Sequence, residues 1–495
     1  MLFTNRQARS SAVTVVMTTL VCAFASTAYA QSTVAPKAHA ERAIAAVIAG
    51  GERAILAHLD QRRIQGRLVG RELEHLIAQG DRLFRAKFTK FDGAGRPLAT
   101  QAILPTKRKR PAPAVFQRLA GLDAGSCASC HNDPIAGGAG DFTVNAFVSE
   151  GFTNPDFDTT DPQFSNERNT NHVFGAGLIE LLAREMTSDL QRIRTSALAA
   201  ARATGQPAER GLETKGIKFG RIVAQPDGLV DLSGIQGVDT DLVVRPFSQK
   251  GVIASLRQFT INALNHHHGM QAAERFGPRW TDEADFDGDG VDNEISAGDV
   301  SALVAWQATR PVPQMMIPNV QRLADAIRKG GAEFDAAGCS ACHVRALPLS
   351  SSIFRDPGPV DAAGTLRAGD VPAVTEFDLV EFAWMKRLER TANGDILVPL
   401  FGDLKRHVMT DRQVDGLGNE LLSQRFVGRN IFMTAELWGV GSTAPYGHRG
   451  DFTTLDGVIR AHGGEARASR DAYIALDDRS RRSVIAFLRS MVIVP

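Results

Sequence analysis

This 495-residue sequence lacks a charge excess of either sign, a short-period repeat and, beyond its first thirty residues, any long apolar stretch. Its 56 basic and 55 acidic side chains leave a formal net charge of +1, which gives no support to nucleic acid or another polyanion as the main partner. With 43% apolar and 22% charged residues, the composition is that of an ordinary globular protein, long enough for two or three domains.

The first thirty residues have the pattern of a secretory signal peptide. Arg6 and Arg9 supply the positive start, residues 12–24 are mostly apolar, and Ala28-Tyr29-Ala30 fits the small-residue cleavage rule. An uncleaved anchor is the alternative, but threonines interrupt the apolar stretch. No later stretch is long and apolar enough to span a bilayer. We therefore expect a periplasmic or secreted protein with no stable membrane span after cleavage.

Cysteine is scarce, at five residues, and its placement narrows the chemistry. Cys22 lies in the expected signal peptide, and the others form two pairs, Cys127 with Cys130 and Cys339 with Cys342, each followed at once by histidine. Disulfides do not call for a histidine after each pair, and a zinc site would need further ligands. A thioredoxin-like pair would lie in a strand-rich setting and would not need the histidine.

The C-x-x-C-H spacing is typical of covalent haem attachment. Two thiols three positions apart can each add to a vinyl group of one porphyrin, and the next residue then reaches the iron with its imidazole. The sequence therefore predicts two covalently bound haems c, with His131 and His343 as proximal iron ligands. Whatever occupies the opposite face of each iron decides between electron transfer and chemistry on a bound molecule.

The chain is expected to be mainly α, with two cytochrome c-type haem domains, short helices held by long loops, and little sheet. Apolar residues near helical spacing predict an N-terminal helical segment over about residues 40–90 and a helix over 318–336 that leads into Cys339. We predict a signal peptide at 1–30, an N-terminal helical segment and loop at 31–110, a first haem domain at 111–312, and a second cytochrome c domain at 313–495.

An acidic loop in the first haem domain predicts a calcium site. Asp285, Asp287 and Asp289 alternate in a D-x-D-x-D-G pattern, so three carboxylates can point inward around a hard cation, and Gly290 permits the sharp turn. Glu294 is the expected further ligand, although it comes two positions before the place at which an EF-hand has its bidentate glutamate. An acidic surface turn without an ion is the alternative.

The C-terminal region carries a second motif. The run Pro445-Tyr446-Gly447-His448-Arg449-Gly450 resembles the PY-x-H-x-G signature of bacterial di-haem peroxidases and the related MauG-like enzymes. Residues 462–466, His-Gly-Gly-Glu-Ala, are more similar still to the di-haem oxidoreductase branch, sometimes labelled thiol oxidoreductase. The resemblance covers about residues 90–495, and its specific parts are this motif and the paired C-x-x-C-H.

The resemblance implies a sixth ligand for the second haem. In that superfamily the residue about fourteen positions after the motif histidine binds the second iron, and here this position is His462. A haem held by His343 and His462 follows. His448 is implied to be a structural or haem-edge residue. The alternative for His462 is a helix cap before two glycines.

The resemblance also makes the first haem the candidate reaction centre. In the matching segment the relatives place a carboxylate that moves protons, whereas this chain has His266, His267 and His268. An imidazole can take the same role near neutral pH, or it can bind the iron. His172 is a second distal candidate, and a solvent-facing polar cluster is the alternative. Gln249 stands where relatives have a tryptophan that relays electrons.

These implications predict a periplasmic di-haem c-type oxidoreductase, in which electrons pass from the second haem to a peroxide- or oxygen-reactive first haem. Two alternatives stay open: a di-haem oxygenase or MauG-like modifying enzyme, and a non-catalytic electron-transfer cytochrome. The expected partners are a small redox protein or quinol-linked electron donor and a small-molecule oxidant. The expected cofactors are two haems c, with Ca²⁺ in the acidic loop.

Overall fold

The computed structural model describes residues 50–95, 125–140, 143–145, 167–420 and 427–494, together with positions 45, 48, 105, 107, 109 and 425. The expected signal peptide lies outside these residues. The chain divides into two compact units, Met1–Glu52 and Arg53–Pro495, and the second holds both C-x-x-C-H motifs. Among the helices in the described ranges, none combines the length and apolar character needed to cross a bilayer.

Helix outweighs strand in the described part, at 39% against 14%, so the mainly α prediction is confirmed in this coarse form. The haem domains themselves stay a prediction. The helices are α2 (Gly70–Arg85), α3 (Cys127–Cys130), α4 (Ala176–Thr204), α5 (Leu256–Ala263), α6 (Ala273–Phe276), α7 (Pro278–Thr281), α8 (Ala297–Ala308), α9 (Gln321–Ala336), α10 (Leu455–Arg460), α11 (Arg467–Ala475) and α12 (Asp478–Arg489).

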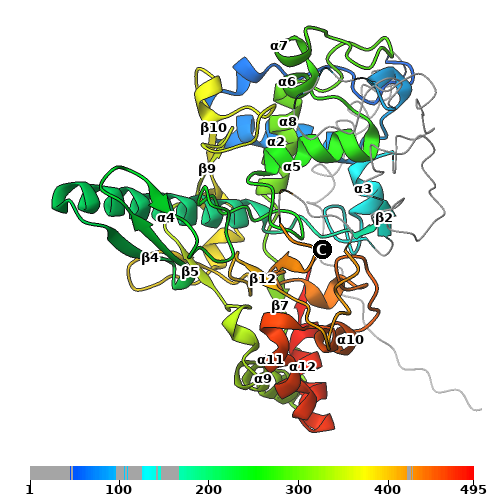
Figure 1. Ribbon diagram of the computed structural model, residues 1–495. Coiled ribbons are helices and arrows are strands. Elements are labelled where there is room, and N and C mark those ends of the chain that lie inside the picture. Colours follow the sequence, from blue (N-terminus) through cyan, green and yellow to red (C-terminus); the bar gives the residue numbers. More distant parts are fainter. Residues whose placement is uncertain are drawn as a thin grey trace, which may run out of the picture. The chain divides into compact units, whose positions relative to one another are not determined.

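Helix α8 is the central helix of the larger hydrophobic core, with α2 and α5 beside it (Figure 1). Its residues from Gly298 to Ala308 are all buried, as expected for a helix that packs against neighbours on every side. Two glycines allow other helices to approach it closely. A Cβ atom at Gly80 of α2 would overlap the carbonyl oxygen of Ala302, and one at Gly177 of α4 would overlap that of Ala308.

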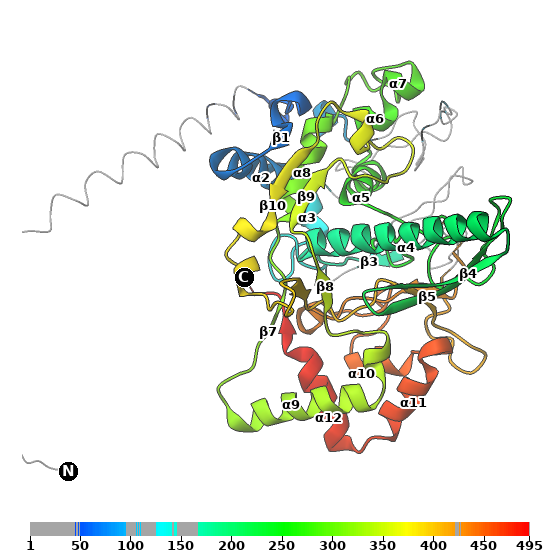
Figure 2. The same ribbon diagram turned by 90° about the vertical axis from the view of Figure 1, so that its left-hand side faces the viewer.

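The C-terminal helices build a second, smaller core (Figure 2). Helices α9 and α12 pack against each other, and Gly330 of α9 lies against the backbone of Ser483 in α12. Helix α9 spans Gln321–Ala336 and ends three residues before Cys339, which confirms the predicted helix over 318–336. The buried members of this core are Ile327, Phe334, Phe401, Leu455, Tyr473, Val484, Phe487, Leu488 and Met491.

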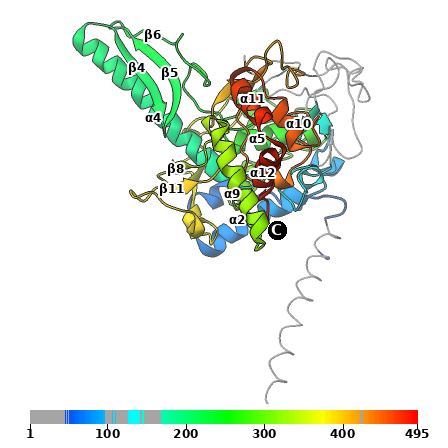
Figure 3. The same ribbon diagram turned by 90° about the horizontal axis from the view of Figure 1, so that it is seen from below.

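Six small sheets occur in the described part, which is more sheet than expected. The longest strands, β4 and β5, form a hairpin along the second half of α4, where Ala197 and Ala201 are fully buried (Figure 3). The strands are β1 (Gly66–Arg67), β2 (Thr143–Asn145), β3 (Glu167–Asn169), β4 (Ala208–Thr214), β5 (Ile217–Ala224), β6 (Val230–Asp231), β7 (Gln314–Met315), β8 (Leu347–Leu349), β9 (Ile353–Asp356), β10 (Thr375–Asp378), β11 (Ile396–Val398), β12 (Arg406–Val408), β13 (Ile431–Met433) and β14 (Met491–Val492).

The helical prediction for residues 40–90 is wrong over residues 53–69. That stretch holds the short 3₁₀ turn η1 (Gln61–Ile64) and strand β1 instead, and α2 is the helix of this region. Gly66 has a φ of +89°, which ends any helix, and β1 then pairs in parallel with β10. Hydrogen bonding to a distant strand therefore overrides the local periodicity.

The larger core draws on residues from Ile55 to Trp438, so the segment after residue 312 contributes to both cores. Strand β14, next to the C-terminus, pairs with β7, which follows the predicted domain boundary between residues 312 and 313. The predicted domain boundaries stay predictions.

Candidate functional site

The first C-x-x-C-H motif forms the single turn of α3, and His131 follows directly. The His131 N–H donates to the carbonyl of Cys127 at 3.0 Å, which brings the imidazole back toward the two cysteines. The ring lies 5.9 Å from that of Phe84, and its buried Nδ1 atom has no hydrogen-bond partner among the described residues. Burial, followed by the charge of His267, lowers the pKa of His131 to about 4. The imidazole is therefore neutral, as a metal ligand must be.

The second motif begins in the 3₁₀ turn η5 (Cys339–Ala341), and its backbone repeats the first: the His343 N–H donates to the carbonyl of Cys339 at 3.0 Å. Nδ1 of His343 donates to the carbonyl of Phe401 at 3.2 Å. Since a carbonyl can only accept, the proton is on Nδ1 and Nε2 carries the lone pair. Burial, followed by the charge of His462, lowers the pKa of His343 to about 4.

His462 follows helix α10 and has the same hydrogen-bond pattern as His343. Its Nδ1 donates to the carbonyl of Val458 at 2.8 Å, so its Nε2 also carries a lone pair. Burial lowers the pKa of His462 below its usual value. The charge of His462 is also one of the causes that lower the pKa of His343. The bond to Val458 also caps the end of helix α10. His462 can therefore cap this helix through Nδ1 and still have Nε2 available for a metal.

The three consecutive histidines lie in a π-helical turn, η4 (Leu264–His268), that continues α5. Single π-helical turns are frequent at functional sites. Nε2 of His268 is 3.6 Å from Sγ of Cys127, and the charge of His267 contributes to the lowered pKa of His131. His266 and His268 are buried, and His267 is half-buried. The turn therefore lies against the first C-x-x-C-H motif.

His172 reaches the same region, and both its ring nitrogens are engaged. Nε2 donates to the carbonyl of Trp438 at 3.0 Å, and Nδ1 accepts the N–H of Phe174 at 3.2 Å. Burial lowers the pKa of His172 to about 4, so the ring is neutral. In this arrangement His172 is fixed in place, whereas proton transfer by its ring would require one of these bonds to break.

His448 packs against Phe432 with the two rings tilted and their centroids 4.6 Å apart, and its carbonyl accepts the N–H of Asn169 at 3.0 Å. Burial, followed by the charges of Arg168 and Lys250, lowers the pKa of His448 to about 3. Lys250 is itself buried and donates to three backbone carbonyls of residues 428–431, at 2.7–3.0 Å. The Gln249-Lys250 pair thus anchors strand β13, since the Met433 N–H also donates to the carbonyl of Gln249 at 2.9 Å.

Sequence reasoning missed a charged cluster beside the second motif. His407 lies between Asp403 and Glu465. Its Nε2 atom is 2.8 Å from the Asp403 carboxylate, and its Nδ1 atom is 2.8 Å from the Glu465 carboxylate. Burial lowers the pKa of His407, but its hydrogen bonds to Asp403, Cys342 and Glu465 outweigh burial and raise it to about 10. Glu436 is close by, and burial raises its pKa to about 7. Glu465 is 58 residues from His407 in the sequence, so no local sequence pattern predicts the cluster.

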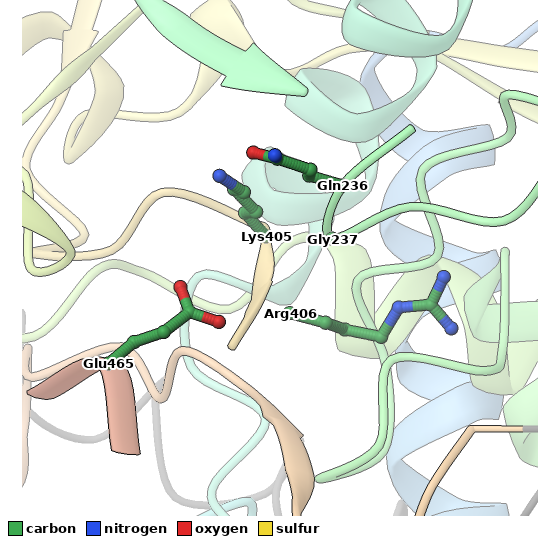
Figure 4. Close-up of a pocket in the computed structure, with 5 residues that line it drawn as sticks. All are labelled: Gln236, Gly237, Lys405, Arg406 and Glu465. Carbon is green, nitrogen blue, oxygen red and sulfur yellow. The ribbon is translucent and has the colours of Figure 1, made fainter. Parts of the chain in front are cut away.

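A polar pocket opens next to this cluster (Figure 4). Its lining consists of Gln236, Gly237, Lys405, Arg406 and Glu465, and its volume is about 360 Å³. The Arg406 side chain extends away from Glu465 and pairs with Asp239 at 2.5 Å. None of the expected haem ligands lines the pocket, so it is a neighbour of the second site rather than part of it.

The cysteines of both motifs fit covalent attachment better than redox exchange. No disulfide joins the four cysteines at 127, 130, 339 and 342. Burial raises the pKa of Cys127 to about 12 and that of Cys339 to about 11. A thioredoxin-like pair needs a lowered thiol pKa, because the thiolate is the nucleophile.

The acidic loop brings its three aspartates together. One carboxylate oxygen each from Asp285, Asp287 and Asp289 lies within 4.8 Å of the others. Glu294 is buried beside them, and burial, followed by the charges of the aspartates, raises its pKa. It is not one of the three residues whose oxygens lie within 4.8 Å of one another. The structure thus gathers three of the four expected ligands.

The comparisons with known proteins agree with the di-haem interpretation. Residues 387–491, which include His448 and His462, match the family model described as "Di-haem oxidoreductase, putative peroxidase". No curated protein sequence matches this chain. Solved structures with some likeness are a hydrazine synthase of Kuenenia stuttgartiensis and a MauG-like protein associated with microbial copper homeostasis.

The two structural likenesses are weak. The hydrazine synthase is 12% identical, with 88% of this chain and 93% of that chain covered and a TM-score of 0.33. The MauG-like protein is 16% identical, with 55% of this chain and 78% of that chain covered and a TM-score of 0.28. Scores this low carry no argument about the fold, so the comparison that counts is the family match.

Proposed function

We propose that this chain is a periplasmic enzyme with two covalent haems c that reduces a small oxidant, most simply hydrogen peroxide or dioxygen, and the match of residues 387–491 to the di-haem oxidoreductase model supports this. Each C-x-x-C-H motif would hold one haem, with His131 and His343 as proximal ligands. Haem supplies the redox chemistry, and the protein sets which iron face is open.

The observation that carries the proposal is a difference between the two sites. At the second motif, His343 and His462 each commit Nδ1 to a backbone carbonyl, so the Nε2 atoms of both would be available to hold the iron of one haem. Two imidazole ligands close both iron faces, which suits electron transfer. This side would accept electrons from a small redox protein or a quinol-linked donor.

The first motif faces the triple-histidine turn instead. His267 is half-buried, and its charge is one of the causes that lower the pKa of His131, so its imidazole is placed to hold or deliver a proton at the first motif. His268 contacts Cys127 and fixes the turn against the motif. His172, neutral and bonded on both nitrogens, would hold the backbone around Trp438. These groups suit proton delivery to an oxidant at the first haem.

Two other functions fit parts of the same arrangement. A MauG-like modifying enzyme or a di-haem oxygenase would use the same division between the haems, with another substrate at the first. An electron carrier is the rival that the triple-histidine turn itself favours, because one of its imidazoles could bind the first iron and close it.

Spin state tests the proposal. Electron paramagnetic resonance and visible spectra of the purified protein are expected to show one low-spin and one high-spin haem. The reduced high-spin haem should bind carbon monoxide, and peroxide should oxidise the reduced protein. Two low-spin haems that neither bind carbon monoxide nor react with peroxide would overturn the proposal in favour of an electron carrier.

A further inference from the structure

The acidic loop contains a buried carboxylate that the protein itself leaves unsatisfied. Asp287 is fully buried, and neither of its carboxylate oxygens has a hydrogen-bond partner among the described residues. These oxygens face those of Asp285 and Asp289, within 4.8 Å. A buried carboxylate without hydrogen bonds is strongly disfavoured unless a cation compensates its charge.

Nearby lysines do not neutralise this cluster. Lys109 pairs with Glu283 at 2.5 Å, and Lys107 pairs with Asp282, just outside the loop. Among the described residues, no basic side chain forms an ion pair with Asp285, Asp287 or Asp289, so the charge of these carboxylates is left for a bound cation to balance.

The backbone already holds the loop in a closed turn. The Asp285 carboxylate accepts the N–H groups of Gly288, Asp289 and Gly290 at 2.7, 3.1 and 2.9 Å. Gly288 and Gly290 have φ angles of +71° and +91°, which glycine adopts without strain. The aspartates are thus gathered on one side of a preformed turn.

We propose that Asp285, Asp287 and Asp289 bind one Ca²⁺ ion. Their ligand atoms are all carboxylate oxygens, which hard cations prefer, and a loop of this kind can complete the shell with backbone carbonyls and water. Mg²⁺ fits less well, because it demands a tight octahedral shell and keeps most of its water. Glu294 lies beside these aspartates, accepts the N–H of Gln271 and acts as a positioning residue.

The same loop is tied to the triple-histidine turn of the first site. The Gln271 N–H donates to Oε2 of Glu294 at 2.6 Å, and the Ala273 N–H donates to the carbonyl of Ile295 at 2.9 Å. Gln271 comes three residues after His268, the last residue of η4. An ion that orders residues 285–294 would therefore also hold this turn in place. This second part rests on the proposed function, whereas the binding itself does not.

Calorimetric titration of the chelator-treated full-length protein with calcium chloride tests the site. The wild type is expected to bind one Ca²⁺ per chain and to melt at a higher temperature in Ca²⁺ than in chelator, since binding to the folded state alone raises stability. Asp287→Asn should lose about tenfold or more in affinity, which is about 1.4 kcal/mol, and should lose the melting shift. Asp292→Asn removes one charge from an exposed position of the same loop and should keep both.

The variant itself separates binding from folding. Asp287→Asn keeps the size of a buried side chain whose oxygens have no hydrogen-bond partner among the described residues, so in chelator it should melt no lower than the wild type. A wild type that shows neither heat nor a melting shift with Ca²⁺, or that binds Mg²⁺ more tightly, would overturn the site. If Ca²⁺ binds but the spectrum of the first haem is identical with and without it, the link to the histidine turn is wrong. If the protein carries no haem, the titration still decides the site.

Discussion

Replacing His462 with glycine is expected to convert the second haem from low spin to high spin and to leave the spectrum of the first haem nearly unchanged. The reason is the shared pattern at His343 and His462, where each Nδ1 is committed to a carbonyl and each Nε2 can bind iron. Losing an axial ligand shifts the reduction potential, and about 120 mV changes a one-electron equilibrium about 100-fold. Turnover should therefore fall by about tenfold or more. Electron paramagnetic resonance resolves the two haems.

The glycine leaves a cavity that a small molecule can fill, so adding free imidazole to the His462→Gly protein should restore the low-spin signal. A change at His75, which is exposed on α2, to glutamine should have no effect on either haem. If the His462→Gly protein keeps its original low-spin signal, the ligand lies elsewhere, and His448 and His407 are the next candidates.

Changing His266, His267 and His268 together to glutamine is expected to slow the reaction with peroxide by about 10²–10⁴-fold, the usual contribution of a positioned acid or base. His268 of the turn contacts Cys127 of the first motif, and the charge of His267 contributes to the lowered pKa of His131. The second haem should keep its spectrum, because these contacts join the turn to the first motif. Stopped-flow mixing with peroxide measures the rate.

The single variant His267→Gln separates proton delivery from packing, since His267 is half-buried while its two neighbours are buried. It should account for most of the loss of rate with little change in haem spectra. If the triple variant instead turns a low-spin first haem high spin, one of the three histidines is an iron ligand. The resting protein would then be closed, and the electron carrier would be the better interpretation.

Local patterns predicted the features that depend on neighbouring residues. Helix α9 was predicted because its apolar residues recur at helical spacing up to Cys339, and the aspartates at 285, 287 and 289 do gather as their alternation suggested. The β4–β5 hairpin was missed, although buried and exposed residues alternate along β5 and the Lys215-Gly216 turn has positive φ at both positions.

Features that depend on distant contacts were out of reach. Strand β1 exists because residues 66 and 67 pair with residues 375 and 376, so periodicity alone wrongly extended the N-terminal helix. The His407 cluster joins Asp403 to Glu465 across 62 positions, counted as 465 minus 403, and no spacing rule connects them. Sequence likewise gave Glu294 a ligand's role, whereas the fold bonds its carboxylate to the N–H of Gln271.

The central claim is that both C-x-x-C-H motifs carry a covalent haem, and intact-mass spectrometry of the purified protein tests it most directly. After acid–acetone extraction, which removes haem that is not covalently bound, the mass is expected to equal the processed polypeptide plus two haems. Cys127→Ser with Cys130→Ser should lower it by one haem, as should Cys339→Ser with Cys342→Ser. A wild-type mass equal to the bare polypeptide would contradict the account.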